Sequence, residues 1–96
     1  MIGKIHSIQG RNILAVCDKE YVGKEFEDGK IFFKASERFY GDESISEEEI
    51  LENLKAVDSV NLFGNKCIEI LEKKGLIKEN NVILIKGIKH AQIYQI

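Results

Sequence analysis

The 96-residue chain carries a formal net charge of −2, and 44% of its residues are hydrophobic and 31% charged. This length suits a single core, so we expect residues 1–96 to form one compact domain. The composition excludes an intrinsically disordered chain, and the absence of an excess of basic residues disfavours a protein that coats duplex DNA. No apolar run approaches the ~20 residues that cross a bilayer, and the N-terminus lacks a secretory signal pattern. We therefore expect a cytoplasmic protein with no membrane partner.

Two β-hairpins are predicted in the first third of the chain. The β-rich runs 2–8 and 13–17 flank a turn sequence at 9–12. A second hairpin is centred on Asp28-Gly29, a pair that tolerates the positive φ angles of a type I′ turn. Both hairpins are expected to feed the same sheet.

A first helix is predicted at 47–57. Ser46 and Glu49 match a capping box, and the acidic first turn suits the positive end of the helix dipole. Residues 40–53 contain six Asp or Glu and no Lys or Arg. We expect this segment to repel phosphate.

A second helix is predicted between Asn61, as its N-cap, and Gly75, a glycine typical of a left-handed C-terminal cap. Its apolar stripe places Cys67 inside the protein. The chain is expected to finish with a strand at 81–86 and a short extended tail at 93–96.

Strands, then two helices, then strands again predict an α+β fold. We expect a mostly antiparallel sheet with both helices packed on one face. A mixed sheet is the alternative, because the continuous apolar run 82–85 suits a central strand with a parallel neighbour.

Cys17, His6 and His90 form the candidate set for catalysis or metal binding. If Ile8 pairs with Ile13, then His6 and Cys17 lie within side-chain reach on one sheet face. A Cys beside a His can act as a nucleophile, and both residue types bind zinc. None of them shows the close paired spacing of a zinc motif, so we assign no metal and no cofactor. The alternative is a buried structural thiol and a hydrogen-bonded histidine.

Two polar segments are candidates for ligand contact. One is the turn expected at 87–92, where cations, an imidazole and an amide suit an anion or nucleotide. The other is a structured loop expected at 35–44, whose aromatic residues can stack on a ring. The predicted ligand-binding residues are Lys86, Lys89, His90, Gln92, Phe39 and Tyr40. A solvated turn and a loop that packs its own rings on the sheet explain the same residues without a ligand.

Seven short motifs, taken in order, resemble a known family. They are Gly3-x-Ile5-His6, Ala15-Val16-Cys17-Asp18, Gly23-Lys24-x-Phe26, Phe39-Tyr40-Gly41-x-Glu43, Asn61-Leu62-x-Gly64, Gly75-x-Ile77 and Gly87-x-x-His90-Ala91-Gln92. Their order and spacing are similar to those of the archaeal family catalogued as domain of unknown function 424. The resemblance implies an archaeal, cytoplasmic, single-domain protein, and it implies no established activity.

The basic residues near the C-terminus and the lack of a complete catalytic set favour a non-enzymatic binding module. We expect an accessory to translation or RNA metabolism, whose partner is RNA or a translation-associated protein. One alternative is a small enzyme or metal-binding protein that uses Cys17, His6 and His90. Another is an interaction subunit whose acidic helix docks on a basic protein.

Overall fold

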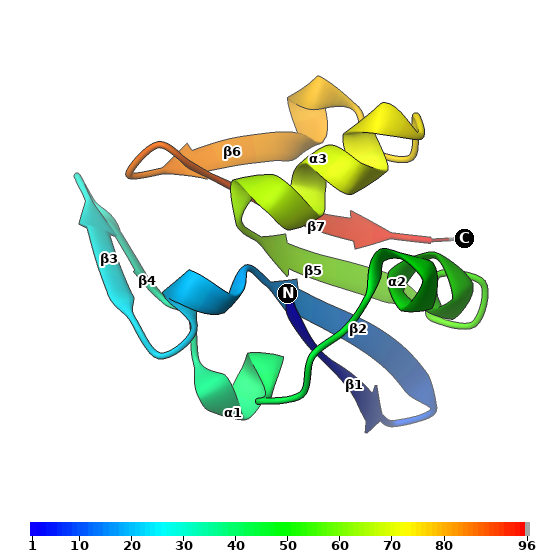
Figure 1. Cartoon of the computed structure of the whole chain (residues 1–96). Helices are drawn as coiled ribbons and strands as arrows, with labels where there is room; N and C mark the ends of the chain where they lie inside the picture. The colour runs from blue at the N-terminus through cyan, green and yellow to red at the C-terminus, as the bar shows by residue number, and fades with distance from the viewer. Residues whose placement is uncertain (96) are drawn as a thin grey trace.

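A five-stranded mixed sheet forms the centre of the fold (Figure 1). The computed structural model describes residues 1–95, and the strand order of its sheet is β1-β2-β5-β7-β6. The strands are β1 (Ile2–Ile8), β2 (Arg11–Cys17), β5 (Ser59–Phe63), β6 (Val82–Ile85) and β7 (Ile88–Tyr94). Strands β2 and β5 run parallel, and the other neighbours are antiparallel. The predicted α+β fold is therefore confirmed, with a mixed sheet.

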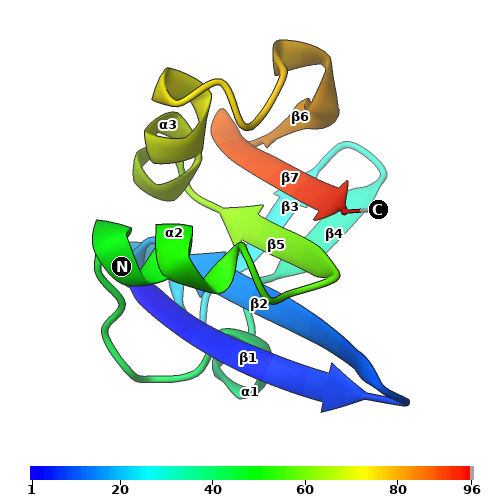
Figure 2. The ribbon, with the colours of Figure 1, turned by 90° about the vertical axis from the view of Figure 1, so that its right-hand side faces the viewer.

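The helices α2 (Glu47–Asn53) and α3 (Asn65–Lys73) pack on one face of this sheet, as predicted. The hairpin of β3 (Glu25–Asp28) and β4 (Ile31–Lys34) forms a separate two-stranded sheet, so the expectation that both hairpins join one sheet is wrong. It lies on the other side of the main sheet from α2 and α3 (Figure 2). The remaining short elements are the 3₁₀ turns η1 (Lys19–Tyr21) and η2 (Glu79–Asn81) and the helix α1 (Glu37–Tyr40). Within residues 1–95, no helix has the length and apolar character needed to span a membrane.

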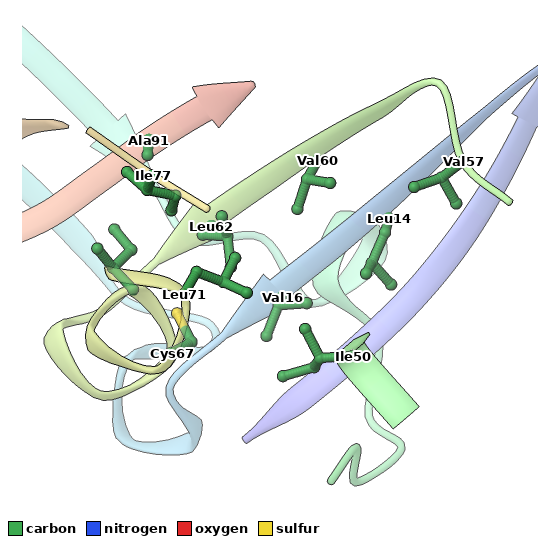
Figure 3. Packing of buried hydrophobic residues seen from close by; sticks show 11 residues of the cluster. Leu14, Val16, Ile50, Val57, Val60, Leu62, Cys67, Leu71, Ile77 and Ala91 are labelled. Carbon is green, nitrogen blue, oxygen red and sulfur yellow. The ribbon is translucent and has the colours of Figure 1, made fainter. Parts of the chain in front are cut away.

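The main core lies between the sheet and the two long helices (Figure 3). Side chains alternate between the two faces of a strand, so every second residue of β2, β5 and β7 points toward the helices. The buried residues of this core include Leu14, Val16, Ile50, Val60, Leu62, Cys67, Ile68, Leu71 and Ala91. Cys67 is fully buried on the inner side of α3, as the apolar stripe predicts.

Rings from the β3–β4 hairpin make a second, aromatic core on the opposite face. Phe26 and Phe33 pack on Phe63 of β5, with ring centroids 5.2 and 4.5 Å apart. The tip of the hairpin is tied to the sheet by Asp28, whose carboxylate accepts a hydrogen bond from the Lys86 amide (2.9 Å). Asp28 is thus the last residue of β3, and the turn falls at residues 29–30, one position later than predicted.

The helix ends that depend on local sequence are confirmed. The capping box of Ser46 and Glu49 is present at the start of α2. At the end of α3 the amide of Leu76 donates to the Leu71 carbonyl (2.9 Å), which is the long bond of a Schellman motif around Gly75. Helix α2 ends before Leu54, so its predicted extent to residue 57 is too long.

The structured loop expected at 35–44 contains a short helix. Ser36 caps α1, and its hydroxyl oxygen accepts hydrogen bonds from the amides of Arg38 and Phe39. A single turn of helix is too short to show a hydrophobic period, so the sequence pattern does not reveal it.

Asn61 is not a helix cap. It lies in β5, and α3 begins only after Gly64. The cap is supplied by the buried Asp18, whose carboxylate accepts hydrogen bonds from the amides of Lys66 (2.9 Å) and Cys67 (3.0 Å). A cap from a residue 48 positions away leaves no local signal, which is why the sequence prediction fails here.

The C-terminal strands also differ from the prediction. Strand β6 is an edge strand with Ile83 and Leu84 exposed, and β5 is the central strand instead. The turn comprises only residues 86–87, both with positive φ, so most of the predicted 87–92 turn belongs to β7. Residues 93 and 94 of the predicted tail at 93–96 likewise belong to β7, Gln95 follows the strand, and position 96 lies outside the described residues.

We predict that Asp18→Ala lowers the free energy of unfolding by about 2 kcal/mol, because it leaves two amides of α3 without an acceptor. Gly64→Ala is expected to cost at least as much, since its Cβ would overlap the Asp18 carboxylate at a φ of +127°. Unfolding in urea measures the loss of unfolding free energy in both variants. The control is Glu20→Ala, an exposed carboxylate nearby, and an equal loss in the control would contradict the capping role.

Candidate functional site

The side chains of His90 and Gln92 lie on the sheet face opposite α2 and α3. His90 is the Cα partner of Phe63, which packs against the hairpin, and Gln92 is the partner of Asn61. The hydroxyl of Tyr40 donates a hydrogen bond to Oδ1 of Asn61 (2.6 Å). We call this group the open sheet face; it consists of Tyr40, Asn61, His90, Gln92 and Tyr94. The β3–β4 hairpin leaves Gln92 exposed and Tyr94 70% exposed.

The sequence does not single out Asn61 or Tyr94 as site residues. Asn61 precedes a helical pattern and is mistaken for its cap. Tyr94 has a signal in the sequence, since residues 90, 92 and 94 share a face if they belong to one strand. The mistaken turn at 87–92 hides this alternation.

His90 lies at the boundary between the open sheet face and the aromatic core. Its ring centroid is 4.9 Å from that of Phe33 and 5.9 Å from that of Phe63. Its Nε2 atom is buried and has no hydrogen-bond partner within residues 1–95. Burial lowers the pKa of His90 below its ordinary value, so the ring is neutral at pH 7. His90 therefore offers a neutral imidazole rather than a positive charge.

The two predicted lysines lie away from this face. Alternation along β7 sends Lys89 toward α3, where its Nζ lies 2.8 Å from a carboxylate oxygen of Glu72. The hydrogen bond to Glu72 raises the pKa of Lys89. Lys86 is in the β6–β7 turn, at the end of the strand that is furthest from Tyr94. The lysines and His90 thus do not form the basic cluster that the sequence suggests.

The aromatic pair of α1 lies on the same side of the sheet. Tyr40 is buried, and burial raises the pKa of its hydroxyl, which therefore stays protonated and donates to Asn61. Phe39 is half-buried and stacks on His6, with ring centroids 5.0 Å apart and planes 12° from parallel. The His6 Nε2–H donates to the carbonyl of Phe39 (2.6 Å). Both rings pack on the protein, and Phe39 keeps a partly exposed edge.

His6 and Cys17 are not close neighbours. The turn of the first hairpin places Ile8 opposite Arg11, so the expected pairing of Ile8 with Ile13 is wrong. Ile13 is instead the partner of His6, and Cys17 lies four residues further along β2. Four residues of strand span about 13 Å, which is too far for a hydrogen bond between the two side chains.

Both cysteines are buried free thiols. Burial, with a smaller effect from the Asp18 carboxylate, raises the pKa of Cys17 to about 12. Burial also raises the pKa of Cys67. Neither is a thiolate at neutral pH, which is the form that a nucleophile or zinc ligand requires. Within residues 1–95, no three His, Cys, Asp or Glu side chains are grouped so that they could hold a metal ion.

Comparison with known proteins gives a family and a fold but no activity. A family model described as "Protein of unknown function (DUF424)" matches residues 6–96. The structure is similar to the crystal structure of an uncharacterized conserved protein from Methanopyrus kandleri, with a TM-score of 0.80 and 24% sequence identity. That similarity covers 97% of this chain and 89% of the other. No curated protein matches the chain.

We predict that Cys17 and Cys67 do not react with Ellman's reagent in the native protein at pH 8, because both are buried and protonated. Two thiols per chain should appear once guanidinium unfolds the protein. The absorbance of the released thionitrobenzoate measures the number of reactive thiols in the native and in the unfolded protein. Rapid reaction of one thiol without denaturant would show an activated cysteine.

We predict that acidification destabilises the protein through His90. The folded pKa lies below the ordinary value of 6.5, so the unfolded chain takes up the proton first as the pH falls. The stabilisation by neutral His90 is therefore complete above pH 6.5 and is lost from there down to the folded pKa. Melting temperatures between pH 7.5 and 5.5 should fall less steeply in His90→Phe, whose ring does not titrate. Equal slopes in both proteins would contradict this assignment.

Proposed function

Because the chain belongs to the DUF424 family, whose description assigns no activity, we propose its function from its own surface. We propose that the protein is a non-enzymatic binding module that holds bases of single-stranded RNA on the open sheet face. In this role it serves as an accessory to translation or RNA metabolism.

The observation that supports this proposal is that uncharged hydrogen-bonding groups and a tyrosine ring share one face of the sheet, where Gln92 and Tyr94 are exposed. The amides of Asn61 and Gln92 lie on paired positions of neighbouring strands, and Tyr94 is the next residue on the same face of β7. Amide groups hydrogen-bond the edges of unpaired bases, and tyrosine rings stack on base faces.

The charges favour binding through bases over binding through phosphates. The net charge is −2, and the positive charge of Lys89 is paired with Glu72 on the helix side of the sheet. The neutral His90 adds no positive charge to the face. Affinity should therefore depend only weakly on salt, in contrast to a protein that binds through many phosphate contacts.

We predict that the fluorescein-labelled RNA octamer U8 or A8 binds the protein and that duplex RNA of the same length does not. Tyr94→Ala should weaken octamer binding about tenfold, since stacking on one base contributes about 1–3 kcal/mol. Gln92→Ala should weaken it less, because it removes hydrogen bonds that water partly replaces. Fluorescence anisotropy measures these affinities.

Phe32 provides the matched control for Tyr94. It is an exposed aromatic residue (64%) on the side of the hairpin that faces away from the sheet. Phe32→Ala should leave octamer binding unchanged. Failure of both octamers to bind, or equal losses in Tyr94→Ala and Phe32→Ala, would contradict the proposal.

A further inference from the structure

The outer edge of β1 is covered along only half of its length. The segment that connects α1 to α2 returns to this edge, where the Gly3 amide donates to the Glu43 carbonyl (3.0 Å). The Ile45 amide donates to the Met1 carbonyl (3.0 Å). Beyond Gly3 the connecting segment makes no backbone hydrogen bond to β1, although Gly41 lies against the Lys4 side chain. Figure 2 shows the rest of β1 at the margin of the sheet.

The uncovered half of β1 presents backbone groups that have no partner within residues 1–95. Backbone amides and carbonyls alternate between the two sides of a strand, so those of Ile5 and Ser7 point outward like those of Gly3. No backbone hydrogen bond of the described residues engages them. Ile5 is 46% exposed and Ile8 55% exposed. Such an edge is a template for a further strand.

A groove of about 430 Å³ lies beside this edge, between β1 and α2. Three carboxylates line it, from Asp42, Glu43 and Glu49. Lys4 is the cation of the lining, and its Nζ donates a long hydrogen bond to the Arg38 carbonyl (3.4 Å). The groove is therefore acidic, and it would repel a phosphate backbone.

We propose that the free edge of β1 binds an extended, basic segment of a partner protein by β-strand addition. The added strand would pair with residues 5–8, a length of about 13 Å. The side chains of the added strand that point to the α2 side of the sheet would lie beside Ile5 and in the groove. There a Lys or Arg side chain of the partner would meet the three carboxylates. A second copy of this chain is a poor occupant, because it would bring the same carboxylates together.

A labelled hexapeptide of alternating lysine and valine tests this proposal. We expect this peptide to bind the protein in 50 mM salt and to bind more weakly in 500 mM salt. The matching glutamate–valine peptide should not bind. The lysine–valine peptide methylated on every backbone nitrogen keeps its charge and loses its donors, so its affinity should fall at least tenfold. Equal binding of the methylated peptide would overturn strand addition.

Two protein variants separate the backbone contact from the charge contact. Ser7→Pro removes an outward N–H and leaves the ladder to β2 in place, so it should weaken peptide binding about fivefold while the protein stays folded. Glu43→Gln should weaken binding at 50 mM salt, while Glu79→Gln, remote from the groove, should not. The Tyr94→Ala protein should bind the peptide with unchanged affinity, because this substitution alters only the open sheet face. A stable dimer that Ser7→Pro dissociates would show a second copy on the edge and overturn the proposal.

Discussion

The fold depends on the contact between Asp18 and the start of α3. The parallel pairing of β2 and β5 brings the ends of both strands together, and the Asp18 amide donates to the Phe63 carbonyl (3.0 Å). The carboxylate of the same residue then caps α3, above a glycine at position 64 that leaves room for it. This single buried residue connects a strand end, a glycine with positive φ and a helix start. It also fills the helix N-terminus that a free anion would otherwise occupy.

The residue before this junction, Phe63, anchors the cover on the other face of the sheet. Phe63 is the last residue of β5 before the junction, and alternation along the strand directs its ring to the opposite face, where the short β3–β4 hairpin packs its rings. Each hairpin strand has four residues, and the aspartate at the tip is tied to the β6–β7 turn. The hairpin therefore covers one end of β5 and β7 and leaves Gln92 and Tyr94 exposed. The proposed RNA-binding surface is this uncovered remainder.

Local signals in the sequence predict local structure well. The capping box at Ser46 and the glycine cap at Gly75 involve residues within a few positions of each other, and both are present. Interactions between distant segments are not predicted. The cap from Asp18 is one example, and the register of the first hairpin is another, since a turn of two residues rather than four shifts every pair along the ladder.

In the candidate site, likewise, single residues could be predicted from the sequence, but their grouping in space could not. His90, Gln92 and Tyr40 could be selected from the sequence as polar or aromatic residues near turns. Their grouping with Asn61 depends on the β5–β7 pairing and on a hydrogen bond across 21 positions. Closeness in sequence suggests that the lysines and His90 form one group, but strand alternation places Lys89 on the other face.

Binding of single-stranded RNA to the open sheet face would change the environment of the backbone amides beneath the bases. The most direct test is an NMR titration of ¹⁵N-labelled protein with an unlabelled U8 or A8 octamer. We expect the largest changes in amide chemical shift at residues 90–94 and Asn61, with little change along α2. Changes confined to other surfaces, or none with either octamer at millimolar concentration, would contradict RNA binding at the open sheet face.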